Sequence, residues 1–334
     1  MTMEIDWFQK YLMECSALAD QEASGIRTYC LCPGCKETPI NSHSQQMRGA
    51  LSLIARDGKV VAPERKFFGP ISKLNHRIVP VTIRRASTFK GFCARHDTEV
   101  FRAIERRPLV PNDEEQVLAF HRRAFGFEIK NKFDMGAHLD AMWRIMKSRG
   151  IYPDPAHEDW ESYLRVLDIL LRADRDFIWE PLWKADPMHE VSYVWRVIPH
   201  RIDISMASVI SAASEKHLKQ YFGCHVDLEK DACDRPRPSF TLTIVPEREQ
   251  THVVMAWNRC VEPFVGPFRE RMVSKDDRVF AEFLNHCVFC MSEDFCLSPD
   301  LWDSIPPETK AALEEDLHAE DFRAQMVVPD IIKV

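Results

Sequence analysis

Two short-spaced pairs of zinc-binding side chains constrain this chain more than any other feature. Cys32 and Cys35 enclose a Pro-Gly turn, and Cys93 and His96 stand three residues apart where a helix is expected to begin. Zinc takes four sulfur or nitrogen ligands at tetrahedral corners, and two such pairs supply all four. Gly34 relieves the strain of the tight turn between the first two thiols. We therefore predict that Cys32, Cys35, Cys93 and His96 hold a structural Zn²⁺.

Two alternatives stand beside this prediction. The pairs can be unrelated reduced thiols, and Cys30 can take the place of Cys32, although Cys32 and Cys35 have the better spacing. The chain has eleven cysteines. It begins with an amphipathic segment that carries Glu4 and Asp6, so no secretion signal is expected there. Its thiols are therefore expected to be reduced thiols and metal ligands in a cytosol and not a disulfide framework.

Charge is distributed unevenly along the chain. The net charge is −7, but residues 1–110 hold 17 Lys and Arg against 11 Asp and Glu, whereas residues 111–334 carry a net −13. This contrast, together with Pro108 and Pro111, predicts a basic zinc module at 1–110 and an acidic domain at 111–334. A basic module attracts a polyanion, so we predict nucleic-acid contacts. The candidate residues are Arg48, Arg84, Arg85, Lys90 and Arg95. The alternative is that the basic module contacts only its own acidic domain.

Apolar periodicity predicts a mixed helix and strand protein. A run of eighteen apolar residues does not occur, so no membrane span is expected. Most of the predicted strands follow one another between residues 191 and 257, which indicates an antiparallel sheet covered by helices and the α+β class. Helices are predicted at 4–23, 45–57, 95–107, from 112 or 113 onward, 137–147, 160–173, 276–290 and 307–318, and strands at 59–62, 77–83, 191–199, 202–209, 240–245 and 252–257.

His43 is the strongest candidate for chemistry. It follows the Cys32–Cys35 turn, and folding around zinc would hold it near the helix that carries His96. The string Cys-x-x-Cys, His43, Cys-x-x-His-Asp97 resembles the ββα-metal (HNH) nucleases, in which a treble clef often holds zinc. The resemblance implies a treble-clef-like module, His43 as general base and Asp97 as ligand of a catalytic Mg²⁺ or Mn²⁺.

The resemblance to the nucleases covers residues 30–105 and departs from their pattern at three points. Ser42 stands where those enzymes have an acidic residue before the histidine, and Asp97 stands where they have a late histidine. Their middle asparagine has no clear counterpart here. The alternative interpretation of His43 is a buried histidine or an alternative zinc ligand that orients the Cys32–Cys35 turn.

A wider run is similar to a widespread group of uncharacterised bacterial proteins. It comprises the Cys-x-x-Cys pair, Ser-His-Ser-x-Gln at 42–46, the helix end at 51–58 and the Ser-Thr-Phe-x-Gly-Phe-Cys-x-x-His-Asp run that opens 87–105. This similarity implies a metal-built N-terminal module and a bacterial, cytoplasmic origin. It carries no activity.

A second set of metal-binding residue types near the C-terminus is assigned to the core. It lies in an apolar neighbourhood without a Gly or Pro turn, and free cysteine is among the most often buried residues. The residues are His286, Cys287, Cys290 and Cys296.

Three functional hypotheses follow. The first is metal-dependent cleavage of nucleic acid, in a setting such as defence against foreign DNA. The second is a non-catalytic zinc module that binds nucleic acid or a protein partner. The third is an interaction subunit whose basic module meets only its acidic domain. A Gly-rich phosphate loop and a Gly-x-Ser-x-Gly elbow are both absent from the sequence, which argues against nucleotide-dependent enzymes and serine hydrolases.

Overall fold

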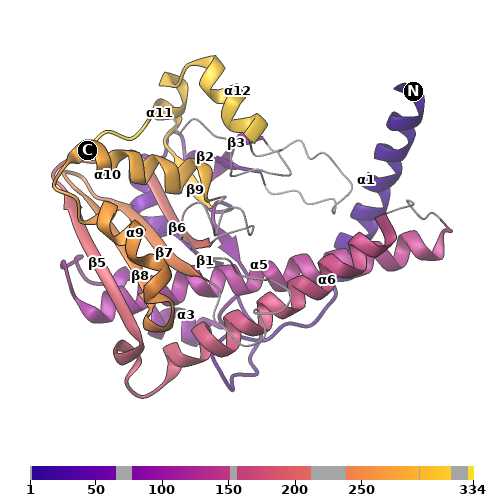
Figure 1. The fold of residues 1–334 in the computed structure, drawn as a ribbon, viewed down its shortest axis with the longest axis horizontal. Helices are drawn as coiled ribbons and strands as arrows, with labels where there is room; N and C mark the ends of the chain where they lie inside the picture. The colour runs from indigo at the N-terminus through magenta and orange to yellow at the C-terminus, as the bar shows by residue number, and fades with distance from the viewer. Residues whose placement is uncertain (1, 65–76, 151–155, 212–237, 293, 317–329) are drawn as a thin grey trace.

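The computed structural model describes residues 2–64, 77–150, 156–211, 238–292, 294–316 and 330–334 (Figure 1). It combines long helices with antiparallel sheets, so the predicted α+β class is confirmed. Among these residues, none of the helices combines the length and the apolar character that crossing a bilayer requires.

A seven-stranded antiparallel sheet forms the centre of the fold. Its strands are rich in branched and aromatic residues, which favour a pleated and buried surface. The order across the sheet is β3 (Ile78–Thr82), β2 (Lys59–Pro63), β9 (Phe295–Leu297), β6 (Ile204–Ser211), β7 (Ser239–Pro246), β8 (Thr251–Asn258) and β5 (Val191–Ile198). The two strands from the first 110 residues thus extend the sheet formed by later strands, and the chain on both sides of the predicted boundary builds one sheet.

Helices cover both faces of this sheet (Figure 1). Neighbouring residues of a strand point to opposite faces. In β7, the ring of Phe240 contacts Phe268 of α9 (Glu262–Met272) at a centroid distance of 5.1 Å, whereas Thr241 hydrogen-bonds His121 of α5 (Glu114–Ser148). Helix α10 (Asp277–Asn285) packs beside α9. Because both faces are covered, β6, β7 and β8 are buried along their whole lengths.

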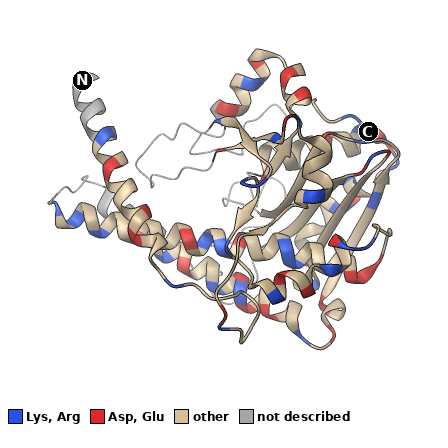
Figure 2. Ribbon diagram, turned by 180° about the vertical axis from the view of Figure 1, so that it is seen from behind, with Lys and Arg blue, Asp and Glu red and all other residues tan. Residues whose placement is uncertain are grey.

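A second, smaller core lies between three helices. The far part of α5 packs against α1 (Thr2–Ser24) and α6 (Ala156–Ala173). Leu12 and Cys15 of α1 are buried there, and the indole rings of Trp143 and Trp160 stack with centroids 5.8 Å apart. Figure 2 shows cationic and anionic residues interspersed along these helices. Some of them form i,i+4 ion pairs within one helix, such as Arg144–Asp140 in α5.

The remaining elements are short. Helices are α2 (Ser52–Ile54), α3 (Ala94–Val100), α4 (Arg102–Glu105), α11 (Pro299–Ser304) and α12 (Pro307–Asp316). Single turns are η1 (Met47–Leu51), η2 (Asp174–Trp179), η3 (Glu180–Trp183), η4 (Pro187–Glu190), η6 (Arg259–Val261) and η7 (His286–Cys290). The helix predicted at 45–57 is thus shorter than expected, the one at 95–107 is divided between α3 and α4, and Cys287, Cys290 and Cys296 are buried in the core as predicted.

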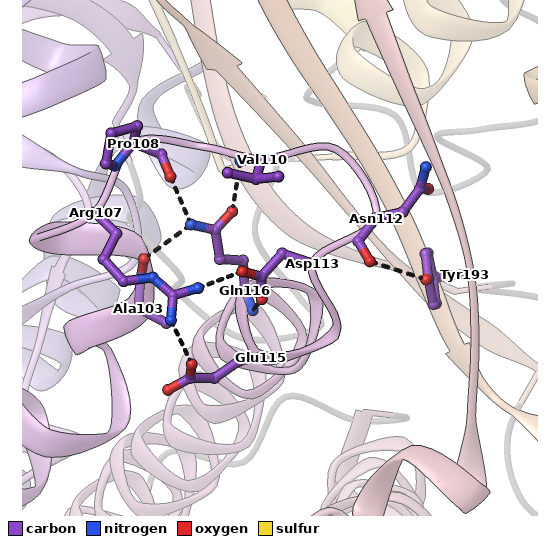
Figure 3. Close-up of polar contacts among 9 residues, drawn as sticks. All are labelled: Ala103, Arg107, Pro108, Val110, Asn112, Asp113, Glu115, Gln116 and Tyr193. Carbon is purple, nitrogen blue, oxygen red and sulfur yellow. Dashed lines mark hydrogen bonds and ion pairs between the residues drawn. The ribbon is translucent and has the colours of Figure 1, made fainter.

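The connection between α4 and α5 is held by the side chain of Gln116 (Figure 3). Its amide nitrogen donates to the carbonyl oxygens of Ala103 and Pro108, at 3.1 and 2.8 Å, and its amide oxygen accepts from the backbone N–H of Val110 at 2.9 Å. Gln116 is fully buried. The proline-containing segment is therefore fastened to the first turn of α5.

A two-stranded ribbon stands apart from the main sheet. Strands β1 (Ser42–His43) and β4 (Thr88–Phe89) pair antiparallel, with His43 opposite Thr88, and α3 follows five residues after β4. The candidate site residues His43, His96 and Asp97 lie on this ribbon and helix.

Candidate metal centre and acid–base cluster

A hairpin and a helix start bring four metal-binding side chains together. The N–H of Cys30 donates to the carbonyl of Glu37 at 3.0 Å, which closes a hairpin around the Pro-Gly turn. Next to it, the N–H of Leu31 donates to the carbonyl of Gly91 at 2.8 Å. The hairpin is thereby held against the segment that leads into α3.

The helix supplies the other two ligands. Cys93 is the N-cap residue of α3, and His96 lies in its first turn. The imidazole Nδ1 of His96 is 3.3 Å from Sγ of Cys30 and 3.4 Å from Sγ of Cys93. Two tetrahedral zinc bonds of ordinary length, one to sulfur and one to nitrogen, would separate those atoms by about 3.5 Å.

The ligand set fits zinc. One ligand atom from each of Cys30, Cys35, Cys93 and His96 lies within 4.8 Å of the others. Three thiolates and one imidazole make a closed, structural type of site. These four residues are positioned to bind a metal ion, which agrees with the predicted structural zinc.

Cys30 takes the position that the sequence analysis gave to Cys32. Cys35, Cys93 and His96 belong to the cluster as predicted, but Cys32 does not. The reason is the register of the hairpin: Cys32 begins the turn, and its carbonyl accepts from the N–H of Cys35 at 3.0 Å. Sequence spacing favours the closer pair of thiols, whereas the pairing of Cys30 with Glu37 decides which sulfur reaches the helix.

Burial disfavours free thiolates at this cluster. It raises the pKa of the Cys30 thiol to about 12, and it also raises the pKa of the Cys93 thiol. Metal ligation requires deprotonated sulfur, so binding an ion here releases protons. The cluster is therefore suited to a cation that binds thiolates strongly, as zinc does.

His43 lies outside the metal cluster and has one ring nitrogen fixed. Its Nδ1 is 3.1 Å from the carbonyl oxygen of Ala86. A carbonyl only accepts, so Nδ1 carries the proton and the neutral ring keeps its lone pair on Nε2. Burial is the main cause that lowers the pKa of His43; Arg123 lowers it too, while the Ala86 carbonyl, Asp97 and Glu105 raise it. The ring is thus a neutral base at neutral pH.

Asp97 directly follows His96 on α3, and it is close enough to His43 for the two side chains to interact electrostatically. Burial raises the pKa of the Asp97 carboxyl, whereas Ser42, Arg123 and His43 lower it. Ser42 is near enough to act on this carboxyl, but the contact falls short of hydrogen-bond geometry. Oδ1 of Asp97 and Oγ of Ser42 are both buried without a hydrogen-bond partner among the described residues.

Two charged residues that interact with His43 and Asp97, Glu105 and Arg123, were missed by sequence reasoning. Arg123 of α5 donates from Nη2 to Oε1 of Glu105 in α4 at 2.5 Å, and its guanidinium lies over the ring of Phe101, 4.3 Å from the centroid. The side chain of Arg123 is only 2% exposed, whereas that of Glu105 is 41% exposed. A sequence signal was present: Gln116, Arg123 and Lys130 recur every seven positions in the part of α5 that also carries Val117, Phe120 and Phe127, and all three are buried.

We call Ser42, His43, Asp97, Glu105 and Arg123 the acid–base cluster. It holds a base, two carboxylates and a cation drawn from β1, α3, α4 and α5. His43 and Asp97, which the sequence analysis paired, act on each other electrostatically. The arrangement can accept a proton at His43 and offer an oxygen of Asp97 to a cation.

The residues predicted to contact nucleic acid are all on the surface. Of these, Arg95 forms an i,i+4 ion pair with Glu99 at 3.7 Å, a weak and exposed contact. The exposed residues are Arg48, Arg84, Arg85, Lys90 and Arg95.

Comparisons with protein families, with curated proteins and with solved structures found no match for this chain.

Proposed function

We propose that this chain is a zinc-stabilised nuclease that hydrolyses phosphodiester bonds with the help of a divalent cation. The observation that carries the proposal is the pairing of His43, whose Nδ1 faces the Ala86 carbonyl so that Nε2 keeps the lone pair, with Asp97, whose Oδ1 has no hydrogen-bond partner among the described residues. The charge of each side chain affects the pKa of the other, and Asp97 directly follows His96 of the metal cluster. The ribbon of β1 and β4 followed by α3 supports the resemblance to the ββα-metal nucleases.

Each residue has a defined task in this mechanism. Nε2 of His43 accepts a proton from the attacking water, and the Ala86 carbonyl holds the ring in the required tautomer. Asp97 would hold Mg²⁺ or Mn²⁺, which neutralises charge on the phosphate when bound. Cys30, Cys35, Cys93 and His96 would hold zinc and thereby fix the start of α3, so that Asp97 keeps its place relative to His43.

Nuclease assays of the purified chain test the proposal. Supercoiled DNA, single-stranded DNA and RNA are incubated with Mg²⁺, with Mn²⁺ and with a chelator. His43→Ala should lower the cleavage rate by about 10² to 10⁴-fold, the range for loss of a general base. Exposed His189 provides a matched control, and His189→Ala should cleave normally. Equal activity of wild type and His43→Ala would reject the proposal.

A second candidate is binding of nucleic acid without cleavage. The exposed cations Arg84, Arg85 and Lys90 favour it, because such side chains pair with phosphates without any catalytic group. Affinity should then fall steeply as salt increases, since bound phosphates release counterions. Binding with that salt dependence and no turnover under any divalent ion would favour this candidate over the nuclease.

A further inference from the structure

Arg123 keeps hydrogen-bond donors that no described residue uses. Its Nε and Nη1 are buried without a partner, while Nη2 is engaged by Glu105. The two other members of its buried polar stripe differ: Gln116 uses its whole amide group, and Lys130 pairs with Asp134. Buried guanidinium donors are rarely left unsatisfied, so Nε and Nη1 of Arg123 require a partner outside the described residues, such as a water or a ligand.

The surroundings of Arg123 indicate an anion. The guanidinium carbon of Arg123 lies over the ring of Phe101, which restricts the movement of the guanidinium. A planar fork of N–H groups matches the oxygen atoms of phosphate, which it can bind with two parallel hydrogen bonds.

We propose that Arg123 forms an oxyanion site that takes a phosphate group, with Glu105 holding the guanidinium until the anion displaces it. Glu105 is suited to leave because its side chain is partly exposed, whereas Arg123 is not. Its carboxylate stands in for the anion in the free protein. As an element of catalysis, this inference rests on the proposed function and names the part of the substrate that is held.

The inference also gives the larger part of the chain a direct role. Arg123 comes from α5, whereas His43, Asp97 and Glu105 come from the first 110 residues. The site is therefore assembled from both parts of the chain. In this arrangement α5 supplies the positive charge that meets the scissile phosphate.

Calorimetric titration of the full-length, metal-loaded chain with inorganic phosphate tests the site. Arg123→Gln should weaken phosphate binding by about tenfold or more, because a charged bidentate contact is lost. Arg102→Gln is the control, since this arginine is exposed on α4, and it should bind as wild type does. Absence of phosphate binding by the wild type, or equal binding by Arg123→Gln, would overturn the inference.

A second variant acts in the opposite direction and so cannot be explained by misfolding. Glu105→Gln removes the competing charge, and phosphate should then bind several-fold more tightly than to the wild type. Unchanged or weaker binding would contradict the role given to Glu105.

Failure of this inference is distinguishable from failure of the nuclease proposal. If Arg123→Gln hydrolyses bis(4-nitrophenyl) phosphate at the wild-type rate, the oxyanion site is rejected and the nuclease proposal stands. If Arg123 binds phosphate but no phosphodiester is hydrolysed, the oxyanion site stands and the nuclease proposal is rejected.

Discussion

The hydroxyl of Ser44 donates a hydrogen bond of 3.0 Å to Oδ2 of Asp294, a residue 250 positions later in the chain. The neighbouring Gln45 directs its amide nitrogen to the same aspartate, at 3.4 Å from both its carbonyl oxygen and Oδ1. Ser44, Gln45 and Asp294 are all buried. The segment that presents His43 is therefore anchored to the chain just before β9.

Replacing Asp294 should destabilise the fold because buried donors would lose their acceptor. We expect Asp294→Ala to lower the free energy of unfolding by about 2 to 4 kcal/mol, measured by urea denaturation. Asp303→Ala is the control: it removes an exposed ion pair with Arg56 and should cost less than about 1 kcal/mol. Similar losses in the two variants would show that the anchor is not energetically important.

Two neighbouring cysteines should differ in metal binding. Cys30→Ser removes a sulfur from the cluster, whereas Cys32→Ser leaves all four ligand atoms in place. Elemental analysis should therefore find one zinc per chain in the wild type and in Cys32→Ser, and clearly less in Cys30→Ser. The unfolding temperature should fall with the zinc content, because binding energy at a structural site is folding energy. The reverse order would restore Cys32 as the ligand.

The pH dependence of cleavage should report His43. Burial and Arg123 lower its pKa, so the base stays neutral, and active, to a pH below the ordinary histidine value of about 6.5. The acidic limb of the kcat/KM profile should lie there. Arg123→Gln removes one of the lowering causes, so the limb of its remaining activity should move to higher pH. A limb that stays in place would show that Arg123 does not act on His43.

The Gln116 side chain should matter more than the ion pairs beside it (Figure 3). Gln116→Ala leaves two carbonyls and one N–H of the junction without their partner, and we expect a loss of about 2 to 4 kcal/mol in the free energy of unfolding. Arg107→Ala breaks pairs with Asp113 and Glu115 that are partly exposed, and it should cost less than about 1 kcal/mol. Thermal or urea unfolding of both variants decides between these expectations.

His121 should make the fold sensitive to acid. Burial lowers its pKa to about 4, and its neutral ring bonds Thr241 at 2.7 Å and Asn258 at 2.9 Å. Between pH 6.5 and 4 the unfolded chain takes up a proton that the folded chain refuses, so stability should decline as pH falls. The full loss is about 3 kcal/mol. Urea denaturation at several pH values should show a flatter dependence for His121→Gln; an identical slope would assign the effect elsewhere.

Local features of this molecule, and the meeting of Cys35 with Cys93 and His96, could be predicted from sequence, whereas other long-range pairings could not. The strands at 191–198 and 239–246 follow from their branched residues, and the Cys93/His96 pair follows from its place at a helix start. The choice of Cys30 depends on a hairpin register that spacing does not encode. The meeting of Arg123 with Glu105 depends on how α5 lies against α4, although its burial was foreshadowed by the seven-residue polar repeat.

Three side chains of helix α5 contact three different parts of the molecule. Gln116, His121 and Arg123 lie within two turns of it and face the α4 junction, the main sheet and the acid–base cluster respectively. A helix advances 100° per residue, so a one-residue insertion near Asp113 could not keep all three aligned at once. The orientation of this one helix therefore sets the geometry of the acid–base cluster and the packing of the core together.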